Sequence, residues 1–201
     1  MSYRSQDQEQ IRPEPLKRLL ANYDSGQRVF HGLVIPESNL AHARLPFIEL
    51  VDANLQKSDL SHAFLVGAEM MRIRLRQSRL VRTNLIGANL LRADLRGSLL
   101  YYAILSGACL IGADFGEASL RDAVLNGCDL RGANFKQANL QGANFQGANL
   151  AGADFRDANL QGTNIDQAQT IGTLMPDGTY LDYFLELLPP APAELASRET
   201  E

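Results

Sequence analysis

The chain contains no tryptophan and only two cysteines, Cys109 and Cys128, in 201 residues. Two cysteines are too few for the disulfide framework of a small secreted protein, and they lack the paired spacing of a zinc site. We therefore expect free thiols and a reducing compartment.

Long apolar runs are also missing. The first residues, MSYRSQDQEQIRPEP, have no apolar core of the kind that a signal sequence needs, and nowhere do about 18 apolar residues follow one another to span a bilayer. The net charge of −4 gives no general attraction to nucleic acid or to an anionic membrane. These features predict a cytoplasmic protein with no transmembrane segment and no nucleic-acid partner.

Catalytic motifs are absent as well. The sequence has no glycine-rich phosphate loop and no local Ser/His/Asp or Cys/His arrangement. His42 and His62, twenty residues apart, come closest to a metal site, but the same series continues with Arg82, Tyr102 and Asp122, which is a mixed surface ladder rather than a ligand set. We expect no enzyme, no cofactor and no metal.

What the sequence does have is a five-residue repeat. Every multiple of five from 40 to 165 is large and apolar, with twenty Leu, four Phe, Met70 and Ile165 in 26 positions. Two residues earlier the chain is small in 24 of the 26 units, with Ile48 and Ile73 as the exceptions. Neither a helix nor a straight strand keeps this period, so the chain must turn once in each unit and point its small and large residues inward. On this pattern Cys128 points inward and Cys109 outward.

A second period sets the number of sides. Phe115, Phe135 and Phe155 lie twenty residues apart, as equivalent positions on successive coils would if like side chains stack. Four units then close one coil, and neighbouring coils can pair their backbones as parallel strands do. Asn or Asp before the large residue is expected to bond nearby backbone, as turn residues do.

These residues carry a resemblance to a known family. The units ANLQG, ANLAG, ADLRG and ADFRD resemble the consensus of the pentapeptide-repeat proteins over residues 28 to 169. The resemblance implies an all-β fold, a right-handed quadrilateral parallel β-helix. The stretches NYDSGQRVF and MPDGT are similar to those that flank the repeats in cyanobacterial members. The fold is shared by proteins of many roles, so function must be argued from the surface.

Both flanks of the repeat predict helical caps. Leu16, Leu19, Leu20 and Tyr23 have helical spacing, which indicates a helix over about residues 14 to 24 within an N-terminal segment 1 to 27. Residues 170 to 188 read as a turn and then an apolar helix from about 180 to 188, and residues 189 to 201 as a disordered tail. The second helix could cap the last coil or join two copies in a homodimer, through Tyr180, Leu181, Phe184, Leu185 and Leu188.

Charge is uneven along the chain. Residues 72 to 96 carry seven arginines against Asp94 alone, whereas residues 97 to 201 carry five basic and thirteen acidic side chains. On a four-sided coil five of the arginines share one side and its corner, where they form a basic patch suited to an acidic protein surface or to phosphates. They are Arg72, Arg74, Arg76, Arg92 and Arg96.

Apolar residues at outward positions are the other anomaly. Val51, Met71, Leu91 and Ile111 are expected to form one exposed ladder, with Tyr101 and Tyr102 on another side. Such apolar surface, confined to the middle coils, is unusual on a monomer and favours a protein interface. We take Met71, Leu91, Ile111, Tyr101 and Tyr102, with the five arginines, as candidate partner-binding residues.

Three functions are compatible with these features. The first is a non-catalytic scaffold or regulator that binds another protein, as the resemblance to pentapeptide regulators of heterocyst differentiation implies. The second is a DNA mimic that binds gyrase, as in the quinolone-resistance pentapeptide proteins, which form acidic rods joined at their C-termini. The third is a structural role in which the basic patch meets anionic lipid.

Overall fold

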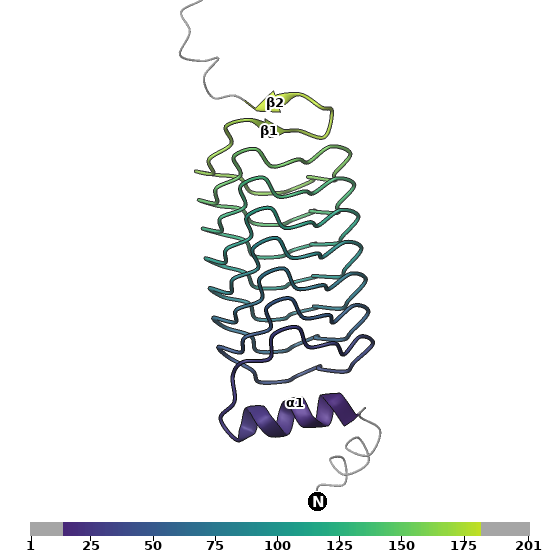
Figure 1. The fold of residues 1–201 in the computed structure, drawn as a ribbon. Helices are drawn as coiled ribbons and strands as arrows, with labels where there is room; N and C mark the ends of the chain where they lie inside the picture. Colours follow the sequence, from purple (N-terminus) through teal and green to yellow (C-terminus); the bar gives the residue numbers. More distant parts are fainter. Residues whose placement is uncertain (1–13, 182–201) are drawn as a thin grey trace, which may run out of the picture.

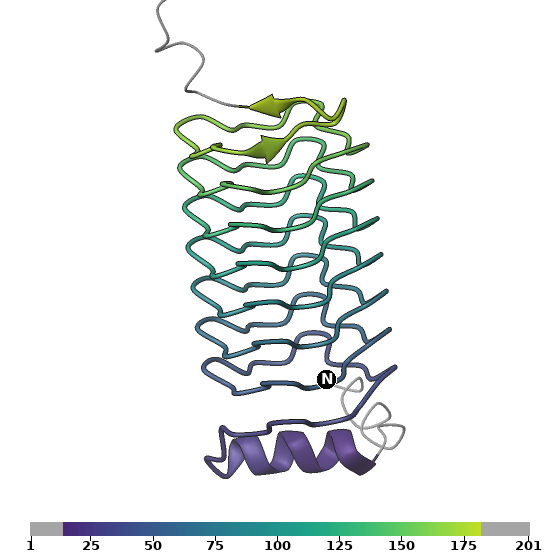
Figure 2. The ribbon, with the colours of Figure 1, turned by 45° about the horizontal axis from the view of Figure 1, so that its top comes forward.

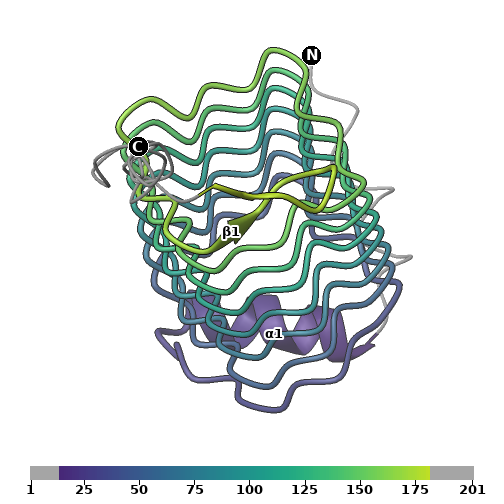
Figure 3. The same cartoon turned by 90° about the horizontal axis from the view of Figure 1, so that it is seen from above.

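The computed structural model describes residues 14 to 181, which form a column of stacked coils (Figure 1). A helix, α1 (Glu14–Asp24), lies at the N-terminal end, and two short strands, β1 (Thr173–Leu174) and β2 (Tyr180–Leu181), lie at the other. Seen along its axis, the column has four sides (Figure 3). No helix in the described part of the chain is long and apolar enough to cross a membrane.

The coils are joined by parallel backbone pairing with a period of twenty residues. Every isolated bridge among the described residues joins residues twenty apart, such as Asn84 with Ile104. Each unit contributes hydrogen bonds in both directions, as where Leu60 N donates to Arg79 O at 2.7 Å and Asn84 N donates to Ala63 O at 2.9 Å. The four-sided coil predicted from the phenylalanine spacing is therefore confirmed.

The core consists of the two inward residues of each unit. Leu75, Leu85 and Leu95 are fully buried, and the residue two positions before each of them is buried as well. Ile48 and Ile73, the two large residues at this second inward position, are also fully buried. Cys128 is buried as well, whereas Cys109 is only half-buried. Side chains of one kind stack directly over one another along the column, because successive coils superpose.

The corners explain why the chain can turn every five residues. Each corner is a pair of turn residues, such as Ile86 and Gly87, and the second residue of the pair takes a left-handed conformation. Glycine adopts this conformation without strain. In the described part of the chain, sixteen residues other than glycine adopt it as well. Where Asn or Asp precedes the large residue, its side chain can support the turn, as where Asn84 Oδ1 accepts a hydrogen bond from Ile86 N at 3.1 Å. This side-chain bond is the one expected from the sequence.

The first coil is covered by α1. Leu16, Leu19 and Tyr23 are buried on one face of the helix. The hydroxyl of Tyr23 donates to the carbonyl oxygen of Pro46 at 2.7 Å, and the guanidinium of Arg28 lies 4.0 Å from the centre of the Tyr23 ring. The helix occupies the stretch in which the sequence predicts one, and it shields the first layer of the column (Figure 2).

The C-terminal end differs from the expectation. Tyr180 and Leu181 do not begin a helix; they form β2, which pairs antiparallel with β1 after the turn at residues 175 to 179. The physical reason is the open edge of the last coil, whose backbone groups favour an added strand over the helical pattern of the apolar residues. Phe184, Leu185 and Leu188 lie outside the described residues, as do the tail segments.

Candidate functional site

The five candidate arginines gather around one side of the column. We call this the arginine side and define it by Asn54, Arg74, Asp94 and Asp114, which are stacked on successive coils. Arg72 and Arg92 stand at the corner before this side, and Arg76 and Arg96 at the corner after it. The group therefore spans both corners of the side, where the sequence analysis expected one.

Two of the five arginines are neutralised by carboxylates. Arg72 donates to both oxygens of Asp52 at 2.7 Å, and these bonds hold the pKa of Asp52 below its usual value. Arg96 Nη2 lies 2.6 Å from Asp94 Oδ2, and its Nε lies 3.4 Å from Asp114. Burial alone would raise the pKa of Asp94, but the hydrogen bonds from Arg96 outweigh it and leave that pKa lowered. These pairs bind their arginines to the protein itself.

The other three arginines are available to a partner. Arg74, Arg76 and Arg92 are exposed and form no salt bridge with any residue from 14 to 181. They occupy two successive coils, so their charges lie close together on a rigid surface. Three unpaired guanidinium groups in such a setting attract a carboxylate or phosphate group.

An apolar ladder runs along the corner beside Arg72 and Arg92. Val51, Met71, Leu91 and Ile111 follow one another there on successive coils. They are half-buried rather than exposed, because each side chain is covered in part by the same position on the next coil. The ladder thus offers an apolar edge of limited width next to the unpaired guanidinium groups.

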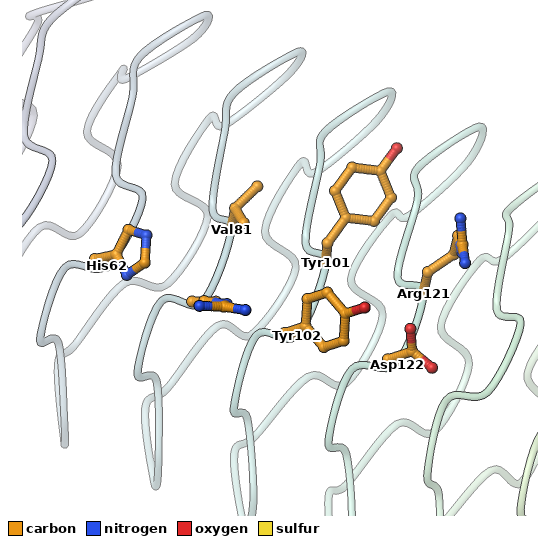
Figure 4. A pocket seen from close by; sticks show the side chains of 7 residues that line it. His62, Val81, Tyr101, Tyr102, Arg121 and Asp122 are labelled. Carbon is orange, nitrogen blue, oxygen red and sulfur yellow. The ribbon is translucent and has the colours of Figure 1, made fainter.

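Tyr101 and Tyr102 are not part of this surface. They stand at the diagonally opposite corner, which we call the Tyr102 corner, together with His62, Arg82 and Asp122. A groove of about 410 Å³ lies there, and its lining includes Val81 and Arg121 (Figure 4). The structure therefore separates the ten candidate residues into two surfaces.

Most of the exposed large apolar residues lie toward the ends of the column. The expectation that apolar surface is confined to the middle coils is wrong, because Val29, Val34, Ile165, Ile171 and Tyr180 are all exposed. The end coils lack a further coil to stack on, which leaves these side chains uncovered.

Phe47 was not predicted as a surface residue, but it is 65% exposed at a corner position. Its ring lies against Gly67 on the next coil. At this corner position the other coils have glycine or a polar residue. A phenylalanine there is therefore the sequence signal from which its exposure could have been predicted.

The acidic half of the chain is partly neutralised. Asp129 pairs with Arg131 at 2.8 Å, and Asp154 pairs with Arg156 at 2.8 Å and with Lys136 at 3.2 Å. Hydrogen bonds from Arg156 and Lys136 outweigh the effect of burial and lower the pKa of Asp154 to about 2. The remaining carboxylates without a salt bridge to a described residue are spread over three corners and include Glu117, Asp122, Asp157 and Asp166.

The two histidines of the suspected ladder stack face to face. The ring centroids of His42 and His62 are 4.8 Å apart and their planes are 6° from parallel. Within residues 14 to 181, no group of three or more His, Cys, Asp or Glu side chains is placed to hold a metal ion. The ladder shows how closely successive coils superpose.

Solved structures show several similar proteins. HetL of the cyanobacterium Nostoc sp. Strain PCC 7120, a pentapeptide repeat protein involved in heterocyst differentiation regulation, is 24% identical; the match covers 82% of this chain and 98% of HetL, with a TM-score of 0.46. A pentapeptide repeat protein of the Arabidopsis thaliana thylakoid lumen is 40% identical over 43% of this chain and 61% of its own, with a TM-score of 0.43. QnrB1, a plasmid-mediated fluoroquinolone resistance protein, is 20% identical over 80% of this chain and 97% of its own, with a TM-score of 0.33. A search of curated proteins found no match.

The family comparison covers most of the chain. The model described as Pentapeptide repeats matches residues 37–77, 78–116, 105–137, 118–157 and 138–169, with eight copies. These matches coincide with the stacked coils, and the family fold is the right-handed quadrilateral β-helix. The chain belongs to the pentapeptide repeat family.

Proposed function

We propose that this protein is a non-catalytic scaffold whose arginine side binds an acidic surface of another protein. The observation that carries the proposal is the set of three exposed guanidinium groups, of Arg74, Arg76 and Arg92, with no salt bridge to any described residue. A surface whose positive charges are not neutralised from within favours an anionic partner.

Rigidity and the apolar ladder support the same function. The side chains stand on a backbone that is hydrogen-bonded to the coils before and after it, so little order has to be gained on binding. Met71, Leu91 and Ile111 add a half-buried apolar edge beside the charges. Interfaces commonly combine an apolar contact with arginine in this way.

The finer form of the proposal is a cytoplasmic regulator that acts by binding. The sequence resemblance to cyanobacterial pentapeptide regulators implies this role. No catalytic step and no cofactor is part of the proposal.

The test compares charge reversals on the arginine side and at the Tyr102 corner. Arg74→Glu with Arg76→Glu reverses two of the three unpaired charges, whereas Arg121→Glu with Arg82→Glu makes the same change in net charge at the Tyr102 corner. At least one protein that the wild type recovers from the native cell should be lost with the first variant and retained with the second. Circular dichroism checks that both keep the β-helix. Recovery of the same proteins by the first variant would contradict the proposal.

A second candidate is the gyrase-binding DNA mimic, which the acidic excess of residues 97 to 201 favours. Pairing of Asp129 and Asp154 with basic side chains reduces that acidic excess on the surface. The unpaired arginines also argue against mimicry of DNA, because DNA is an anion. A gyrase supercoiling assay separates the two functions. Inhibition at micromolar protein that survives Arg74→Glu with Arg76→Glu would favour mimicry.

A further inference from the structure

We propose that the groove at the Tyr102 corner is a second binding site, which takes an acidic peptide segment carrying an aromatic side chain. The inference does not depend on the proposed function of the arginine side. The Tyr102 corner lies diagonally opposite the apolar ladder, and one side of the column separates it from the corner of Arg76 and Arg96.

The groove is formed by two neighbouring ladders of side chains. Val81, Tyr101 and Arg121 follow one another on successive coils, and beside them stand His62, Arg82, Tyr102 and Asp122 (Figure 4). Its volume of about 410 Å³ is enough for one or two side chains, but Tyr102 is still 50% exposed. Since a free small molecule is normally enclosed on most of its surface, an open groove of this kind suits a segment of a larger partner.

Charge selects an acidic segment. Arg82 and Arg121 form no salt bridge with any residue that the structure describes, and Asp122 is the one carboxylate in the lining. Apart from His62, the lining carries two guanidinium groups and one carboxylate. A carboxylate of the ligand can therefore meet a guanidinium group that the protein has not neutralised.

Aromatic surface selects the second feature of the ligand. The rings of Tyr101 and Tyr102 stand next to each other on one coil, with Val81 beside Tyr101 on the preceding coil (Figure 4). The guanidinium of Arg82 lies 5.4 Å from the centre of the Tyr102 ring, within the range of a cation–π contact. Neither tyrosine hydroxyl forms a hydrogen bond within residues 14 to 181, so both are free to donate to a ligand. Tyrosines with free hydroxyls are typical anchors for an aromatic side chain.

Tyr102 has a left-handed conformation with φ 56°, which fifteen other non-glycine residues of the described chain share. Gly142 and Gly162 occupy the same corner two and three coils further on, so the turn accepts glycine in place of tyrosine.

The experiment uses the full chain and a fluorescein-labelled, glutamate-rich peptide that contains phenylalanines. Fluorescence anisotropy at low salt should show saturable binding that weakens as salt rises. Arg82→Gln with Arg121→Gln should weaken binding about tenfold or more, and Tyr102→Gly should weaken it similarly. Both variants are compatible with the fold, because Gln77, Gln141 and Gly142 occupy equivalent corner positions.

Two controls make the result specific. Arg74→Gln with Arg76→Gln alters the arginine side equally and should leave peptide binding unchanged, and a peptide with alanine in place of phenylalanine should bind at least about tenfold more weakly. The proposal is overturned if no saturable binding occurs, if the groove variants bind like the wild type, or if the alanine peptide binds equally well. Loss of binding in the arginine-side variant alone would also overturn it, while leaving the proposed function in place.

Discussion

Phe135 and Phe155, twenty residues apart in sequence, stack with ring centroids 4.8 Å apart and planes 1° from parallel. Phe115 stacks on the other face of Phe135 at 4.9 Å, and Phe145 meets its edge at 5.7 Å. The ring of Phe135 is thus surrounded by aromatic neighbours inside the column, and it is fully buried.

Replacing Phe135 by alanine should strongly destabilise the β-helix. The substitution leaves a cavity between two stacked rings that the hydrogen-bonded coils cannot close, so the free energy of unfolding should fall by about 3–5 kcal/mol. Urea denaturation followed by circular dichroism measures the loss. Phe135→Leu, which restores the commonest residue of the repeat, should cost less than about 1.5 kcal/mol. Equal losses for the two variants would show that the coils collapse around the gap.

The stacking of these rings also explains why the fold could be predicted from sequence. Because each coil superposes on the next, residues twenty apart in the sequence have equal surroundings. The twenty-residue spacing of Phe115, Phe135 and Phe155 is a direct consequence and can be seen in the sequence. Inward positions are predictable for the same reason, since one side-chain size must recur in every unit.

The candidate site was predictable only in part. Periodicity places Arg74 and Asp94 on one side, but which arginines are neutralised depends on rotamers, because Arg72 reaches the preceding coil whereas Arg96 folds back on a residue two positions earlier. The strand at Tyr180 and Leu181 was not predictable from local pattern, because it depends on pairing with β1. Local preference gives way to tertiary contact in such cases.

Gly67→Ala and Gly87→Ala should differ in cost, although both glycines have φ +63°. An added Cβ at Gly87 meets nothing within 4 Å, so the change there costs only the left-handed backbone, about 1–2 kcal/mol. At Gly67 the Cβ would lie 2.6 Å from the ring of Phe47, which must swing into solvent. We expect a larger loss of unfolding free energy at Gly67, measured by urea denaturation.

A double-mutant cycle checks the cause of that difference. In a Phe47→Ala background the two glycine substitutions should cost the same. If Gly67→Ala remains the costlier change there, contact with Phe47 is not the reason.

Stability should fall in acid partly through Asp154. Its pKa of about 2 in the folded state lies below the ordinary value of 3.8, so its salt bridges stabilise the fold above pH 4 and this contribution is lost as pH falls toward 2. Since the Asp154 side chain is only 18% exposed, the contribution is on the order of 1–2 kcal/mol. Asp154→Asn should therefore be less stable than the wild type at pH 7 and lose less stability between pH 4 and pH 2. Denaturation curves at both pH values measure this, and parallel losses in the two proteins would contradict it.

The two cysteines should react very differently with iodoacetamide. Burial raises the pKa of Cys128 to about 12, and its thiol donates to the carbonyl oxygen of Leu105 at 3.0 Å, so it offers neither thiolate nor access at pH 8. Cys109 is half-buried on the outer surface. Mass spectrometry of the native protein should find Cys109 alkylated and Cys128 intact, whereas both should be alkylated in guanidinium chloride. Cys109→Ser should abolish labelling of the native protein, whereas Cys128→Ser should preserve it. Alkylation of Cys128 in the native protein at the rate of Cys109 would contradict the prediction, because it would mean that the coils around Cys128 separate.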